Sequence, residues 1–237
     1  MIVNRQGIIC KTVKYGESSL ILDIFSPDVG MRSYICGGVR KKKSAKASIM
    51  QVMNMVDIVC YDKPANKLYL SRIKEIKFHK IYSHIPFDIV RGTLGIFLIE
   101  VSRKSVTQTD DTESTYDFIA TKFCELDSRG VVLRDFHIRY LIELARVIGF
   151  ELQNNRNQME TVFSLREGMF VDSMLNNKRT LEPELSNILS KYLIGSDVSS
   201  TKIQRKELIN HLIDYYKIHV EGFTDLKSLE VLYTLHD

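Results

Sequence analysis

The spacing of apolar residues changes from a period of two to a period of about 3.6 near Ser83, and this change most constrains the fold. Before it, apolar and β-branched segments are separated by turn residues such as Pro, Asp and Gly. Five strands of unequal length, the first two long enough to curl, are typical of a small closed barrel. A flat sandwich would need more strands. We therefore predict strands at residues 3–15, 20–25, 31–36, 52–61 and 68–76.

The remaining chain is expected to be helical. Its clearest helix is Val131 to Ile148, in which a narrow polar stripe (Asp135, Arg139, Glu143, Arg146) indicates burial on most sides. A polar loop at 151–158 and a short hairpin at 161–171 follow. The predicted fold is α+β, with a barrel domain at residues 1–80 and a helical domain with a hairpin insertion at 81–237. Other helices are predicted from Pro86 to Val101, and at 112–126, 182–193, 201–220 and 225–235.

Charge is distributed unevenly along the chain. Residues 1–80 contain 15 Lys/Arg and 6 Asp/Glu, whereas residues 81–237 contain 18 and 23, so the first third is basic and the rest mildly acidic. Five of these cations fall within seven residues of the segment 37–46, between the third and fourth predicted strands, where Gly and Ser flank them. Such a cluster attracts phosphates through Coulomb forces and counterion release. The cations are Arg40, Lys41, Lys42, Lys43 and Lys46.

Neighbouring strands add further basic and aromatic residues to this region. The tyrosines Tyr15, Tyr34 and Tyr69 could stack on bases if they are exposed, and Tyr34 is the one we select. The alternative is a solvated charge run kept for solubility, with the tyrosines in the core or at its rim. We predict a nucleic-acid site whose strand cations are Lys11, Lys14, Arg32, Arg72 and Lys74.

Several function classes lack support in the sequence. Phosphate-loop, dinucleotide-binding, HExxH and GxSxG motifs are missing, so we expect no catalytic residue, no ATP site and no cofactor. No CxxC pair exists, and the four cysteines are expected to be buried thiols. No apolar run approaches the roughly 20 residues that cross a bilayer. The first residues lack the order of a secretory signal, so we expect a cytoplasmic protein.

The same residues resemble the N-terminal pattern of the bacterial RecO family. The pattern comprises KYGESSLIL at residues 14–22, Phe25-Ser26, Gly30, and Gly38-Val39-Arg40 with Ser44. The end of the predicted central helix, Leu144 and Ile148-Gly149-Phe150, is also similar. The resemblance extends over the whole chain and is closest over residues 7–45.

The resemblance implies an OB-fold barrel that binds single- and double-stranded DNA, followed by a helical domain. It implies a non-enzymatic role in recombinational repair: annealing of complementary strands without ATP and, with RecR, loading of RecA onto DNA coated by single-strand-binding protein (SSB). Carried over by position, DNA contacts fall on Arg32, Arg40 and Lys41–Lys43, which charge alone also selects. Nucleoid association is expected for such a protein.

One departure from the family concerns a metal. Many members carry a four-cysteine zinc site after the central helix, whereas residues 151–180 contain no cysteine here. We therefore expect a degenerate zinc module, without zinc, in which packing alone holds the hairpin.

Partners of the helical domain are a second expectation from the family. Members grip the acidic, Phe-ending tail of SSB, and such a peptide needs an apolar pocket with a cation at its rim. The candidate cations are Arg139, Arg146, Lys178, Arg179, Arg205 and Lys206. The alternative function is that of an RNA-binding OB module in translation or RNA processing, for which the same basic barrel would be suitable.

Overall fold

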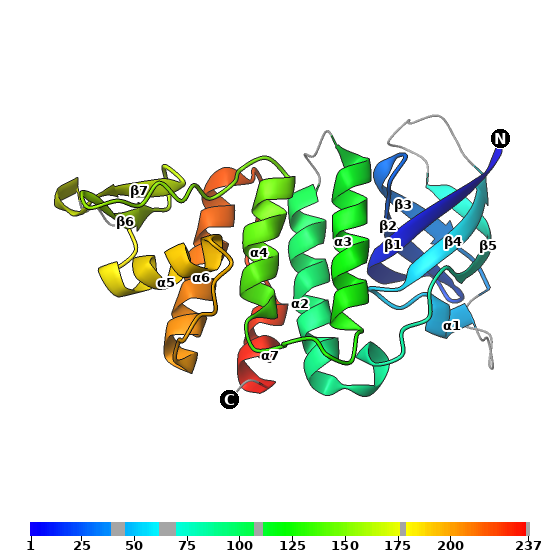
Figure 1. Ribbon diagram of the computed structural model, residues 1–237. Helices are drawn as coiled ribbons and strands as arrows, with labels where there is room; N and C mark the ends of the chain where they lie inside the picture. The colour runs from blue at the N-terminus through cyan, green and yellow to red at the C-terminus, as the bar shows by residue number, and fades with distance from the viewer. Residues whose placement is uncertain (39–45, 62–69, 107–110, 176–178, 236–237) are drawn as a thin grey trace. The chain divides into compact units, whose positions relative to one another are not determined.

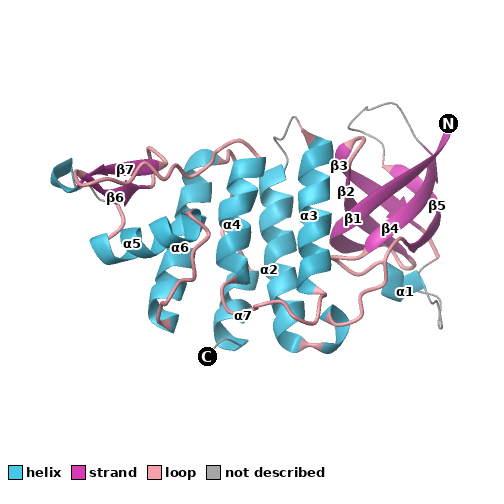
Figure 2. Ribbon diagram, in the orientation of Figure 1, coloured by secondary structure: helices cyan, strands magenta, loops and turns pink. Residues whose placement is uncertain are grey.

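The chain packs into two compact units, which Figures 1 and 2 draw with their secondary structure. The computed structural model describes residues 1–38, 46–61, 70–106, 111–175 and 179–235. One unit comprises Met1–Val131 together with Leu226–Asp237, and the other comprises Val132–Asp225. The division into domains 1–80 and 81–237 stays a prediction. Within the described residues, no helix is long and apolar enough to cross a membrane.

The first unit begins with a closed five-stranded barrel, as the sequence predicts (Figure 1). Its strands follow one another in the order β1-β2-β3-β5-β4, and β3 and β5 pair in parallel whereas the other neighbours are antiparallel. This α+β chain therefore has the predicted OB-like barrel followed by helices. The strands are β1 (Ile2–Tyr15), β2 (Ser19–Ser26), β3 (Gly30–Cys36), β4 (Met55–Tyr61) and β5 (Ser71–Phe78).

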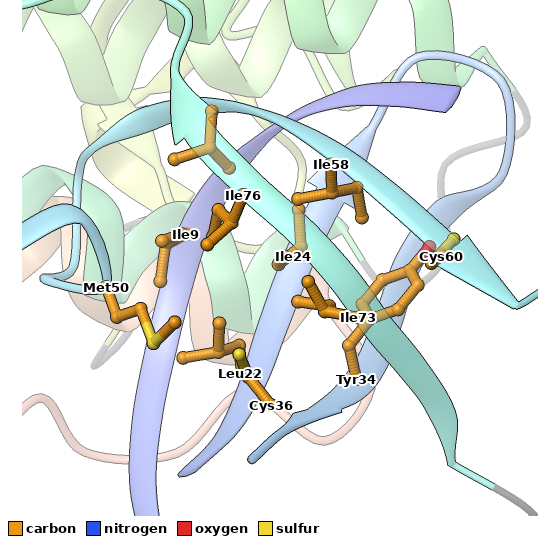
Figure 3. Packing of buried hydrophobic residues seen from close by; sticks show 11 residues of the cluster. Ile9, Leu22, Ile24, Tyr34, Cys36, Met50, Ile58, Cys60, Ile73 and Ile76 are labelled. Atoms are coloured by element: carbon orange, nitrogen blue, oxygen red, sulfur yellow. The ribbon is translucent and has the colours of Figure 1, made fainter. Parts of the chain in front are cut away.

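Alternation along each strand divides the barrel into an inner and an outer surface. Leu22, Ile24, Tyr34, Ile58 and other inner residues pack into one cluster (Figure 3). Residues between them in the sequence, such as Ile21 and Ile35, have the outward register. A register shift between Ile9 and Lys11 in β1 changes the alternation there.

The short helix α1 (Lys46–Ile49) and the turn after it close one end of the barrel. Met50 is 1% exposed and belongs to the inner cluster (Figure 3). The hydroxyl of Thr12 donates to the Met50 carbonyl at 2.8 Å, and the Asn54 amide donates to the carbonyls of Ser48 and Ile49 at 2.9 and 3.1 Å. These bonds fix the chain at the point where it returns to the barrel from the basic segment.

Three helices complete the first unit. They are α2 (Ile89–Ser105), α3 (Thr112–Leu126) and the C-terminal α7 (Ser228–Leu235), with a short 3-10 turn η1 (Ile85–Phe87) before α2. Phe25, on the outer register of β2, is fully buried and lies 6.4 Å from the ring of Tyr116 on α3. Helix α2 packs against β1 and α7 packs against α2. Part of the outer barrel surface is thus covered by helices.

The second unit is helical with a small hairpin. Its elements are α4 (Phe136–Val147), β6 (Glu160–Ser164), β7 (Met169–Asp172), η3 (Ser173–Leu175), α5 (Pro183–Leu193) and α6 (Lys202–His219). Helix α4 begins at Phe136, five residues later than predicted, because Asp135 takes the N-cap position. Asp135 forms an ion pair with Arg139, at 3.4 Å. A capping box formed by Thr201 and Gln204 begins α6.

Candidate nucleic-acid interface

An outward row of side chains crosses all five strands of the barrel. Consecutive cross-strand pairs join Val13, Ile21, Ile35, Arg72 and Tyr61 in that order. Val13 and Tyr61 are 42% and 43% exposed, and the two isoleucines are half-buried. Apolar and aromatic surface of this kind can receive unstacked bases, and an arginine among it supplies a planar cation. We call this row, with Tyr15, the stacking row.

A second outward row lies beside the first one on β1, β2 and β3. It consists of Lys11, Asp23 and Ser33, which pair across the strands. The hydroxyl of Ser33 donates to Asp23 Oδ1 at 2.6 Å. Lys11 is exposed and carries a positive charge next to the apolar row.

The basic segment leaves the barrel at the edge of the stacking row. A Cβ atom placed on Gly37 would lie 3.5 Å from Arg72 Nη2 and 3.8 Å from Ser19 Oγ, so the guanidinium of Arg72 lies over the end of β3. Tyr15, which pairs with Ser19, is 53% exposed at the same edge. Of the predicted cations, Arg40, Lys41, Lys42 and Lys43 lie outside the described residues. Lys46 begins α1, but its side chain lies outside them too.

Tyr34 lies in the barrel core. Its side chain is 0% exposed and belongs to the inner cluster (Figure 3). Burial raises the pKa of Tyr34 to about 12. A buried ring has no face open to a base, so the condition for our selection of Tyr34 is not met and we omit it from the interface. The stacking row instead contains Tyr15, which the sequence indicated only in passing, and Tyr61, which sequence reasoning missed.

The other predicted strand cations lie in different places. Arg72 and Lys11 belong to the two outward rows, and Lys14 and Lys74 are exposed nearby on β1 and β5. Arg32 pairs with Ile24 and so has the inward register of β3. Together with Arg5, its charge acts on the Tyr34 hydroxyl. The structure thus separates Arg32 from the row that contains Arg72.

Another groove, of about 620 Å³, lies on a different part of the barrel and has mixed charge. Its outward lining comes from β1, β4 and β5 and includes Gln6, Asp57, Glu75 and Lys77. Asp57 lies 3.6 Å from Lys77 Nζ and 3.0 Å from His79 Nδ1. Two carboxylates in this groove oppose phosphate binding, in contrast to the face around Arg72.

The second unit contains a cavity of about 350 Å³ beside α4. Arg139, Arg146, Leu152 and Tyr192 are among its lining residues. Arg139 already contacts three groups: the Asp135 carboxylate, the Ser196 carbonyl at 3.3 Å and the ring of Tyr192 at 5.3 Å. Arg146 is exposed.

Of the other predicted partner cations, those that the structure describes do not line this cavity. Arg205 donates to the Ser200 carbonyl at 2.6 Å, Arg179 and Lys206 are exposed, and Lys178 lies outside the described residues. Of the five described candidates, the structure therefore brings together Arg139 and Arg146.

An apolar patch in the first unit was not found from the sequence. Phe87 in η1 and Ile89 and Ile96 in the first half of α2 are 85%, 69% and 44% exposed. The turn beneath them is held firmly, because the Asp127 carboxylate accepts the backbone N–H groups of residues 83, 84 and 85. Burial acts to raise the pKa of Asp127, but these bonds outweigh it and the pKa is lowered. Rigid display of exposed apolar side chains is typical of an interaction surface.

The hairpin after the central helix is held by hydrogen bonds as well as packing, so the prediction of packing alone is wrong. The Asn155 side chain accepts from the Phe170 N–H at 2.7 Å and donates to the Phe170 carbonyl at 3.0 Å. On the other strand, the Ser186 hydroxyl accepts from the Phe163 N–H at 3.0 Å. Among the residues that the structure describes, no group of three or more His, Cys, Asp and Glu is arranged to hold a metal.

Comparisons with known proteins agree with the barrel and extend over the helices. The family described as "Recombination protein O N terminal" matches residues 1–82. A protein of Flavobacterium psychrophilum named "DNA repair protein RecO" is 29% identical over 239 residues, which cover 98% of each chain. The first 82 residues thus resemble the N-terminal region of RecO proteins. Relatives of the same name from Christiangramia forsetii and Porphyromonas gingivalis are 28% and 25% identical, over 98% and 100% of both chains. The similarity to RecO proteins therefore extends over both compact units.

Proposed function

We propose that this chain is a non-enzymatic DNA repair protein that binds DNA through the stacking row and the basic segment beside it. The observation that carries the proposal is the position of Arg72, which lies within an exposed apolar and aromatic row at the point where the basic segment begins. Single strands fit this surface best, because their bases are free to stack while the backbone follows the cations. Duplex DNA would bind mainly through phosphate contacts to the basic segment.

Similarity along nearly the whole chain to proteins named "DNA repair protein RecO" supports a role in recombinational repair. We infer that the chain anneals complementary strands without ATP and, with RecR, helps RecA load on SSB-coated DNA, in the cytoplasm at the nucleoid. Annealing needs no hydrolysis if the protein lowers repulsion between two phosphate backbones and holds bases unstacked. Residues Lys11, Lys14, Arg72, Lys74 and the cations of the basic segment would supply this charge; Arg32, at the inner register, would contribute least.

Strand annealing in the presence of SSB tests this proposal. Complementary oligonucleotides coated with SSB should anneal faster with the protein, and the rate should not depend on ATP. Reversal of Arg40, Lys41 and Lys42 to Glu should abolish the acceleration and flatten the dependence of DNA affinity on salt. An unchanged salt dependence would refute the assignment of the basic segment.

The cavity beside α4 supports a second, separate proposal for the acidic SSB tail. Its lining combines apolar side chains with Arg139 and Arg146, the groups that an acidic peptide with an apolar end requires, and it also includes Glu143 and Glu151, so the peptide's acidic residues must lie on the arginine side. A labelled tail peptide should bind at micromolar concentrations, and Arg146→Glu should weaken binding at least about ten-fold by reversing one charge. If Phe87→Ser weakens binding and Arg146→Glu does not, the tail binds the apolar patch at α2 instead.

Competition with RNA distinguishes the alternative function. An RNA-binding OB module should prefer structured RNA or show no preference. A DNA repair protein should instead keep single-stranded DNA bound when an equal concentration of RNA is added. A preference for RNA would reverse our assignment.

We also propose that the hairpin does not need zinc, because amide and hydroxyl side chains hold both of its strands. Treatment with a strong zinc chelator should leave the Tm unchanged. A fall in Tm that zinc alone restores would contradict this.

A further inference from the structure

We propose that Asp23 makes the barrel prefer bases that carry an exocyclic amino group, and so gives this DNA-binding face a base preference. This inference rests on the proposed function, since it assumes that single-stranded DNA occupies the stacking row. Asp23 is acidic, so electrostatic attraction to DNA does not explain its presence on this face.

Asp23 occupies a central position on the face. It lies on β2, one register step beyond the outward residue Ile21, and pairs with Lys11 on β1 and Ser33 on β3. Its outward register is fixed because Leu22 and Ile24, on either side of it, belong to the inner cluster. A base that stacks on Val13 or Ile21 can therefore lie in two orientations. In one of them, its edge points along the strands and comes close to Asp23.

The carboxylate is oriented but not neutralised. Oδ1 accepts the Ser33 hydroxyl at 2.6 Å, which restricts the side chain to one direction. Asp23 is half-buried, and within the described part of the chain no cation lies within 4 Å of it, Lys11 included. The second oxygen, Oδ2, accepts no hydrogen bond from the described residues.

Only certain partners suit a carboxylate in this position. Phosphate oxygens are repelled, so the strand must place its backbone elsewhere, toward Arg72 and the basic segment. Base amino groups are attractive, because an ionised carboxylate accepts the N4 amino group of cytosine or the N6 amino group of adenine. Thymine presents a carbonyl oxygen at the equivalent position, which would meet Asp23 acceptor to acceptor. The negative charge thus costs some overall affinity and adds discrimination.

The test compares two oligomers that differ only in whether their bases carry the 4-amino group. Wild-type protein is titrated with a labelled deoxycytidine oligomer and with the same oligomer in which 2-pyrimidinone, which lacks the 4-amino group, replaces every cytosine. We expect about five-fold weaker binding of the second oligomer, at the low end for a direct base contact because the site is partly open to water. Asp23→Asn should bind both oligomers with affinities within about two-fold of each other. Ser33→Ala should give an intermediate ratio, since the carboxylate loses its fixed direction.

Glu75→Gln is the matched control. Glu75 is an exposed carboxylate on the outer surface of β5, in the mixed-charge groove, so this variant removes the same charge from a different part of the barrel. It should keep the wild-type ratio between the oligomers. If Asp23→Asn also keeps the wild-type ratio, or wild-type protein binds both oligomers equally with a normal salt dependence, the inference fails while the DNA-binding proposal stands. If wild-type protein binds neither oligomer, the proposed function fails as well.

Discussion

Replacement of Arg72 by Gln tests the DNA face at a described residue. Arg72 lies on the outer surface of β5 and its guanidinium lies over Gly37, at the origin of the basic segment. If it contacts one phosphate of a single strand, its loss reduces the slope of log K against log salt by about 0.7. Extrapolated from about 1 M to about 0.15 M salt, this slope corresponds to roughly four-fold weaker binding, or about 0.8 kcal/mol.

Lys77→Gln provides the comparison on the same strand. Lys77 is also outward on β5, with a side chain that is 78% exposed, but it lies in the mixed-charge groove, 3.6 Å from Asp57. Both variants remove one charge from the barrel, so any general effect of net charge is shared. We expect Lys77→Gln to change the slope by less than about 0.2, since a cation without a phosphate contact releases no counterion.

A third variant separates charge from stacking. Arg72→Lys keeps the charge and loses the planar guanidinium, which can stack on a base. This variant should have the same salt slope as the wild-type protein but a lower affinity for the single strand. The measurement is fluorescence anisotropy of a labelled single strand at four or more salt concentrations. Equal slopes for Arg72→Gln and Lys77→Gln would refute the assignment of this face.

Three further predictions concern stability. Tyr34→Phe should leave DNA affinity unchanged and the Tm unchanged or slightly higher, because the described residues offer its buried hydroxyl no hydrogen bond. Burial acts to raise the pKa of Glu100, but hydrogen bonds from Ser228 outweigh it and lower the pKa. The stability that these bonds give to the docking of α7 should therefore be fully present above about pH 4.5 and be lost as the pH falls through the lowered pKa. Glu100→Gln should cost about 2 kcal/mol in urea unfolding at pH 7. Asn155→Ala should cost about 2 kcal/mol and increase hydrogen exchange at the Phe170 amide first; equal exchange in both proteins would contradict the hairpin's dependence on this side chain.

The sequence predicts the barrel well because local signals suffice for it. Alternating β-branched segments and Pro, Asp and Gly turns define all five strands to within three residues, and β4 and β5 each begin three residues later than predicted, at Met55 and Ser71. Tyr34 could not be placed in the same way. In β3, Tyr34 and Cys36 occupy one register and Ile35 the other, so both faces carry apolar residues and the alternation does not tell which is inside. Pairing with Leu22 decides it.

The stacking row could not be predicted because it depends on the register of five strands at once. Tyr61 ends β4 and is 48 residues from Val13, yet pairing through β2, β3 and β5 places both on one row. Packing of the helices is similarly non-local. Glu100 on α2 accepts three hydrogen bonds from Lys227 and Ser228, more than 120 residues later, and no local pattern indicates this contact.

The position of the proposed DNA face follows from what occupies the rest of the barrel surface. Helices α2 and α3 pack on β1 and β2 near Phe25, so that part of the outer surface is buried. Met50 closes the barrel at one end, and the groove on β1, β4 and β5 carries two carboxylates. Of the described outer surface, the region around Arg72 thus remains both open and cationic. Because this region belongs to the barrel and the candidate tail cavity lies wholly in the second unit, variants of Arg72 and of Arg146 should affect DNA and peptide binding independently. Non-additive effects of the two variants on annealing of SSB-coated strands would then report coupling through the bound DNA and SSB.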